Sequence, residues 1–71
     1  MNTFQNILSN ILGSNWEFSN VLKDDSDIFI CLFNSKDPES IPDKMAAGIN
    51  KHTGKTAFNH LSLDQIEKDL R

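Results

Sequence analysis

Few side chains in this 71-residue chain have the chemistry needed for catalysis or metal binding: one cysteine, two histidines and a cluster of acids. Cys31 lies inside an apolar run, where a thiol is normally buried, protonated and unreactive. The separation of His52 from His60 does not match the i, i+4 or x₃₋₅ spacing that metal sites favour. We therefore predict no catalytic residue, no bound cofactor and no metal ligand.

The acidic segment around Asp25 and Asp27 resembles the first part of a calcium-binding loop. A calcium loop would place another oxygen ligand where Phe29 stands, and it would continue with a glycine and a terminal glutamate at fixed offsets, which this chain lacks. The pattern instead favours a solvated turn between two strands.

Helical spacing of apolar residues appears at both ends of the chain. Residues 4–12 carry one apolar stripe, with Asn2 as the expected N-cap and Gly13 as the expected terminator. Ser62 and Gln65 form a capping box for a last helix, with a hydrophobic staple between Leu61 and Ile66.

The residues between the helices follow strand patterns. We expect strands at residues 16–22, 28–33, 45–49 and 55–58, with a proline-containing loop at 34–44 between the second and third. Two antiparallel hairpins flanked by helices predict a single α+β domain over residues 1–71, in the order helix, four strands, helix. We expect both helices on one face of the sheet.

Every residue of the 28–33 segment is apolar, so both of its faces require cover. If both helices lie on one face, the other face exposes an apolar patch to a partner. Aromatic residues concentrate in interface hot spots, and loops often carry recognition. Whether the aromatic residues are core or interface stays open, and the candidate partner-binding residues are Trp16, Phe18, Phe29, Phe33, Asp37 and Glu39.

Composition excludes several classes of protein. The net charge of −3 and the absence of a basic stripe argue against nucleic-acid binding. No apolar run is long enough to cross a membrane, and the N-terminal segment lacks the features of a signal peptide. A single cysteine favours the cytoplasm, and so small a core favours stabilisation by association, here as a homodimer.

Two segments together carry a family resemblance. The run Phe33-Asn34-Ser35-Lys36 ends an apolar strand, and Gly48-Ile49-Asn50-Lys51-His52-Thr53-Gly54-Lys55 follows as a hairpin. Together they resemble small bacterial immunity-type proteins of the YrhB-like kind, over about the middle third of the chain. The resemblance implies a non-enzymatic protein that binds and neutralises another protein.

The sequence therefore predicts a non-enzymatic interaction module, an inhibitor or immunity-type protein from a bacterium or its phage. Its acidic surface would suit a basic protein partner such as a nuclease. The alternative is a small-molecule-binding or catalytic domain that uses Cys31, His52 or His60.

Overall fold

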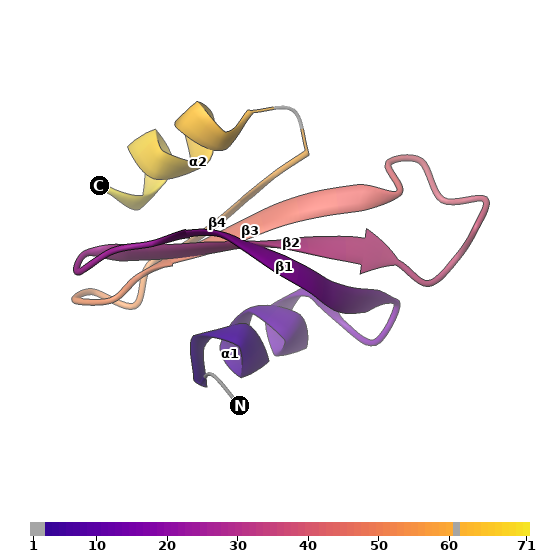
Figure 1. Cartoon of the computed structure of the whole chain (residues 1–71), viewed down its shortest axis with the longest axis horizontal. Helices are drawn as coiled ribbons and strands as arrows, with labels where there is room; N and C mark the ends of the chain where they lie inside the picture. The colour runs from indigo at the N-terminus through magenta and orange to yellow at the C-terminus, as the bar shows by residue number, and fades with distance from the viewer. Residues whose placement is uncertain (1–2, 61) are drawn as a thin grey trace.

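The computed structural model describes residues 3–60 and 62–71 and contains one four-stranded sheet between two helices (Figure 1). The elements are α1 (Thr3–Leu12), β1 (Trp16–Asp24), β2 (Ile28–Ser35), β3 (Lys44–Asn50), β4 (Thr56–Asn59) and α2 (Leu63–Leu70). The predicted α+β class and the order of elements are confirmed. Neither helix in the described ranges is long and apolar enough to cross a membrane.

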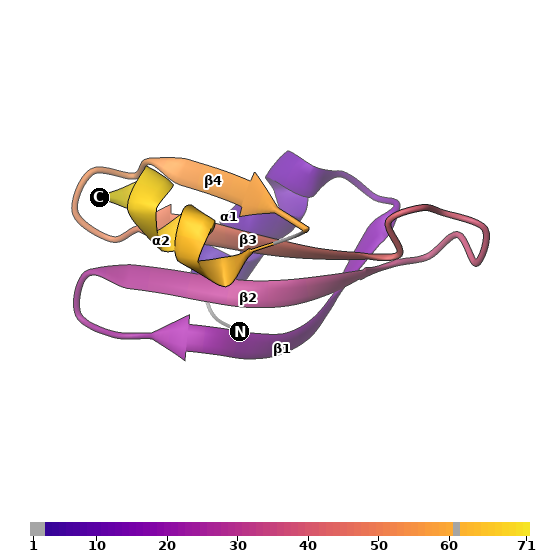
Figure 2. The same cartoon turned by 90° about the horizontal axis from the view of Figure 1, so that it is seen from above.

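The sheet is fully antiparallel, and its strands lie in chain order from β1 to β4 (Figure 2). Strands β2 and β3 form the interior, where Cys31 pairs with Ala47. The edge strand β1 has two register shifts, between Phe18 and Asn20 and between Val21 and Lys23. Such bulges disturb the row of free backbone groups along an edge, which discourages pairing with another strand.

The two helices lie on opposite faces of the sheet, α1 against one and α2 against the other (Figure 1). The expectation that both helices cover the same face is wrong. The apolar residues of β2 alternate between the two faces, so each face carries a set of side chains that gains free energy by leaving water. One short helix on each face buries both sets within a single chain.

Each face of the sheet has its own hydrophobic core. On the α1 face, Leu8 packs with β2 and β3 residues; this cluster comprises Leu8, Phe29, Cys31, Phe33, Ala47 and Ile49. On the α2 face, the helix residues Ile66 and Leu70 pack on the sheet; this cluster comprises Ile28, Ile30, Ala46, Ala57, Ile66 and Leu70. Apart from Leu32, which stays partly exposed, the apolar residues of β2 are thus buried without a second protein.

Helix α2 begins where the sequence predicts. Ser62 is the N-cap, and its hydroxyl accepts a hydrogen bond from the backbone N–H of Gln65 at 3.3 Å. The Gln65 side chain does not return to Ser62 but donates to Asp69 at 2.9 Å, so the reciprocal half of the capping box is replaced by a contact along the helix. The predicted cap at Asn2 and the staple through Leu61 lie outside the described residues.

Candidate functional site

Cys31 lies in the core of the α1 face with no exposed surface. Burial disfavours the charged thiolate and raises the pKa of Cys31 to about 11. The thiol is therefore protonated at neutral pH and lies out of reach of solvent. His60 lines a depression on the other face of the sheet, so the structure does not bring these two residues together.

The two histidines lie at opposite ends of the sheet. His52 is in the turn after β3, where its Nε2 lies 3.1 Å from Asp27 Oδ1 in the turn after β1. His60 follows β4, whose last residue Asn59 pairs with Ala46 near the start of β3. No three of the histidine, cysteine and acidic side chains in residues 3–60 and 62–71 form a group that could hold a metal ion.

The acidic segment joins the two hairpin turns at one end of the sheet. Asp25 Oδ1 accepts hydrogen bonds from the backbone N–H groups of Asp27 and Ile28, both at 2.8 Å. The ammonium group of Lys51, in the opposite turn, lies 2.6 Å from Asp24 Oδ1 and also donates to the Asp25 carbonyl oxygen. These carboxylates are engaged by donors of the chain itself, which gives the cluster a structural role.

The Asp25 carboxylate makes stability depend on pH. Its pKa lies below the ordinary 3.8, because the N–H of Ile28 and then that of Asp27 stabilise the charged form. This stabilisation is complete at neutral pH and is lost as the pH falls below 3.8 and through the lower folded-state pKa.

We expect Asp25→Asn to lower the urea midpoint modestly at pH 7, with a difference from the unmodified chain that shrinks towards zero in strong acid. Urea titrations followed by circular dichroism at a series of pH values measure this difference. Asp43→Asn is the matched control, since the Asp43 side chain forms no hydrogen bond or ion pair with the described residues. A pH-independent effect of Asp25→Asn would contradict the assignment.

The four aromatic residues predicted to bind a partner divide between core and surface. Phe29 and Phe33 are fully buried beneath α1, and Trp16 is partly buried against the same cluster. Phe18, on the edge strand, keeps 40% of its surface exposed, and its ring lies nearly perpendicular to that of Phe33 at a centroid distance of 6.0 Å. The prediction of a partner on the sheet face bearing Phe29 and Phe33 is therefore corrected, because these side chains offer no surface.

The other two predicted residues, Asp37 and Glu39, lie exposed in the loop of residues 36–43, which projects beyond the end of the sheet (Figure 2). We call this segment the β2–β3 loop. Its own hydrogen bonds hold it: Asp37 Oδ1 accepts from the N–H of Glu39 at 2.9 Å, and the Asp37 carbonyl oxygen accepts from that of Ser40 at 3.1 Å. The Ser40 hydroxyl donates to the carbonyl oxygen of Pro42 at 2.9 Å.

The same loop carries Ile41, the most exposed large apolar residue that the structure describes, with 96% of its surface in water. The Ile41–Pro42 peptide bond is cis. Sequence reasoning missed Ile41 because it belongs to no periodic apolar pattern. The available signal was a single large apolar side chain within an otherwise polar, proline-containing loop.

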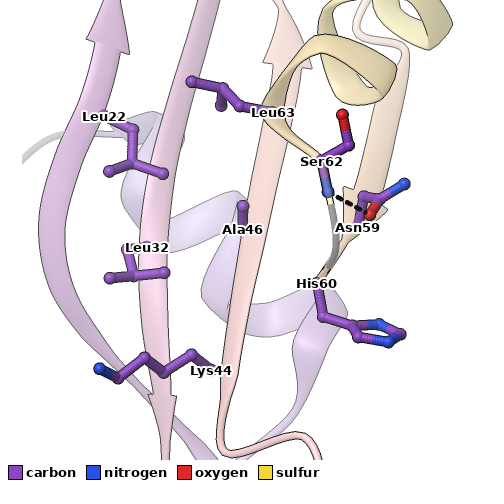
Figure 3. A pocket seen from close by; sticks show the side chains of 8 residues that line it. All are labelled: Leu22, Leu32, Lys44, Ala46, Asn59, His60, Ser62 and Leu63. Atoms are coloured by element: carbon purple, nitrogen blue, oxygen red, sulfur yellow. Dashed lines mark hydrogen bonds between the residues drawn. The ribbon is translucent and has the colours of Figure 1, made fainter.

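A second surface feature lies beside α2, which packs on β3 and β4 and leaves part of that sheet face uncovered. Leu22, Leu32, Ala46 and Leu63 line an open depression of about 170 Å³, which we call the α2 groove (Figure 3). Leu63 extends from the start of α2 toward the two leucines on the strands.

The polar border of the α2 groove contains one lysine, one histidine, neutral polar residues and no acid. Lys44 extends from β3 across β2 at one end, and His60 stands on the side of β4 with its ring directed outward (Figure 3). Neither side chain forms an ion pair with residues 3–60 or 62–71. Sequence reasoning did not find this groove, because its residues come from all four strands, from the segment after β4 and from α2.

Comparison of the chain with models of protein families, with curated proteins and with solved structures found no match. The resemblance to YrhB-like immunity proteins therefore stays a prediction. The structure defines the class of the fold, a three-layered α+β arrangement with one helix on each face of an antiparallel sheet.

Proposed function

We propose that this chain is a non-enzymatic interaction module that binds a protein partner through the β2–β3 loop and so inhibits or neutralises it. The observation that carries the proposal is Ile41, which stands 96% exposed in a loop held in shape by its own hydrogen bonds. A single exposed apolar residue is common on protein surfaces. Its position in a projecting, internally bonded loop is what favours recognition.

The order of the loop matters for affinity. A segment that already has its bound shape loses less conformational entropy when it meets a partner. Besides the bonds within the loop, its base is closed by the backbone N–H of Ser35, which donates to the Asp43 carbonyl oxygen at 2.7 Å. An isoleucine presented in this way gains about 1.5–3 kcal/mol when a pocket of the partner removes it from water.

The charges around Ile41 favour a basic partner. Three exposed acids, Asp37, Glu39 and Asp43, outnumber the one exposed base, Lys36, in the loop, and complementary charge speeds encounter and selects among partners. An inhibitor or immunity-type protein of a bacterium or its phage, acting on a basic target in the cytoplasm, is the class that we propose. The unpaired cysteine agrees with a reducing compartment.

The alternative of a catalytic or small-molecule-binding domain has less support. The thiol of Cys31 is buried, and His52 and His60 lie at opposite ends of the sheet. The α2 groove, at about 170 Å³, is smaller than the ~300–1,000 Å³ of typical ligand sites. It has room for one side chain of another protein.

Substituting Ile41→Ser tests the proposed function. In a pull-down from a lysate of the native host, we expect the unmodified chain to capture a partner that Ile41→Ser does not capture. With that partner purified, titration calorimetry should show affinity weakened by at least about tenfold, because an anchor residue is lost from the contact.

Ile11→Ser is the matched control, since Ile11 is 48% exposed on α1, an element that contributes no residue to the loop. It should bind the partner as the unmodified chain does, and both variants should keep the circular dichroism spectrum. Equal capture by Ile41→Ser and the unmodified chain would overturn the loop as the contact surface.

A further inference from the structure

We propose that the chain forms a reciprocal dimer in which Ile41 of each copy occupies the α2 groove of the other. The inference rests on the proposed function to the extent that both assign Ile41 the role of an anchor. It adds a second contact surface, the α2 groove, and a second binding partner for Ile41, another copy of the chain. The β2–β3 loop and the α2 groove have complementary properties in size, polarity and charge.

The groove has the size and the lining that an isoleucine requires. An apolar cavity of roughly 150 Å³ accommodates benzene, a ring of six carbons. The groove offers about 170 Å³ between Leu22, Leu32, Ala46 and Leu63, enough for the four carbons of an isoleucine side chain. Ile41 does not occupy the groove of its own chain, as its 96% exposure establishes.

The charges at the two surfaces are opposite. Among residues 36–43, the acids Asp37, Glu39 and Asp43 outnumber the one base, Lys36, while the charged group bordering the groove is that of Lys44. A loop that enters the groove brings its carboxylates toward the ammonium group of Lys44 and meets no acid in the lining. Opposite charges therefore favour this docking, and added salt should weaken it.

The positions of the two surfaces suit a two-fold arrangement. Lys44 borders the groove and directly follows Asp43 at the base of the loop, so the loop and the groove adjoin at one end of the sheet. A two-fold axis at that end brings each loop to the other copy's groove, and the assembly closes after two copies. The edge strand β1, with its bulges, need not take part.

Dimer formation and partner binding then compete, because both use Ile41. The dimer withholds the loop from weak or incorrect partners, and a partner of high affinity separates the two copies. Addition of the purified partner should therefore shift the unmodified chain from dimer to a one-to-one complex.

Leu63→Glu tests the groove while leaving the loop intact. Leu63 is partly exposed in the first turn of α2, where an acid is compatible with the helix dipole. The new carboxylate repels the acids of the incoming loop. Sedimentation equilibrium from about 10 μM to about 1 mM suits so small an interface. As the concentration of the unmodified chain rises, we expect its apparent mass to approach twice the 8.0 kDa of one copy.

For both Leu63→Glu and Ile41→Ser we expect a dimer dissociation constant at least about tenfold larger. Ile11→Glu, an equivalent change on the opposite face of the sheet, should dimerise normally. Loss of dimer in Ile11→Glu but not in Leu63→Glu would place the interface on α1 and overturn the inference. A mass that rises past two copies would overturn the closed arrangement.

Mixing the two deficient variants gives the most specific test. Ile41→Ser keeps an intact groove and Leu63→Glu keeps an intact loop, so a mixture regains one of the two contacts. With ¹⁵N-labelled Leu63→Glu and unlabelled Ile41→Ser, amide shifts should appear in residues 36–43, and with the labels exchanged they should appear around the groove. Absence of shifts in both mixtures would overturn the inference.

The tests separate this inference from the proposed function. Leu63→Glu should bind the foreign partner normally, since its loop is unchanged. If Leu63→Glu and the unmodified chain are both monomers and both bind the partner through Ile41, the dimer is wrong and the proposed function stands. If introducing Ile41→Ser into Leu63→Glu and into the unmodified chain leaves the affinity of each for the partner unchanged, the proposed function fails independently of the dimer.

Discussion

Replacing Phe29 with aspartate is expected to prevent the chain from folding. Phe29 is fully buried in the α1-face core, with its ring centroid 5.8 Å from that of Phe4. Loss of a buried phenylalanine alone costs about 3–5 kcal/mol, and an unpaired carboxylate in its place adds several more. A chain of 71 residues has a total stability of only about 4–11 kcal/mol.

Circular dichroism and a ¹⁵N–¹H correlation spectrum measure the outcome, which should be an unfolded chain for Phe29→Asp. Phe58→Asp is the matched control: Phe58 is an aromatic residue of the edge strand β4 and is partly exposed. This control should lose stability but keep the fold. A Phe29→Asp chain that folds and loses only self-association would place Phe29 at an interface, in contradiction to its burial in the core.

The second large effect is expected from Gly48→Val in β3. A Cβ atom at this position would lie 2.7 Å from Leu70 Cδ1 and 3.0 Å from both Ile30 Cγ1 and Ile66 Cγ2. The glycine thus allows α2 to approach the sheet closely. Valine adds two further methyl groups, so we expect a loss of about 2–3 kcal/mol, at the upper end of the usual cost of overpacking, despite the better strand propensity of valine.

Ala46→Val is the matched control for Gly48→Val. Ala46 lies two residues earlier on the same strand and the same face, but it borders the α2 groove. Its additional methyl groups can extend into open space, and we expect a change below about 1 kcal/mol. Urea unfolding monitored by circular dichroism compares the two variants. Equal losses at both positions would contradict the placement of α2 over Gly48 alone.

A second substitution tests the cause of the Gly48→Val effect. Leu70→Ala removes the side chain nearest to the added Cβ atom, and by itself it should cost about 2–5 kcal/mol. The double variant should lose less stability than the sum of the losses in the two single variants, because the cavity left by Leu70→Ala accepts part of the new valine side chain. Strict additivity would indicate that the valine is not in conflict with Leu70.

These two positions also bear on the proposed interactions. Phe29 lies in the core, so a substitution that unfolds the chain abolishes both the β2–β3 loop contact and the α2 groove. Gly48 controls how closely α2 lies on the sheet, and Leu63 at the start of α2 forms one wall of the groove. We therefore expect Gly48→Val to weaken self-association while leaving the β2–β3 loop and its partner in place.

The elements themselves were predictable from the sequence because their signals are local. A run of apolar, β-branched and aromatic residues at 28–33 specifies a strand covered on both faces, whatever covers it. Ser62 and Gln65 specify the start of α2 through a hydrogen bond between neighbours in the chain. The α+β class follows from the order of such elements.

The site could not be predicted in the same way. Whether Phe29 or Phe18 meets solvent depends on where α1 packs, and the helical stripe of α1 does not specify a face of the sheet. Leu22, Leu32 and Leu63 look like ordinary core residues in sequence, and they border an open groove only because α2 is too short to cover the whole face.

Secondary structure, turn chemistry and the apolar character of both faces of β2 could therefore be read from the chain alone, since each depends on residues close together in sequence. The placement of the helices on opposite faces, the burial of Phe29 and Phe33 and the exposure of Ile41 follow instead from how the elements pack. The free energy of those choices comes from contacts between segments far apart in sequence, which no local pattern records.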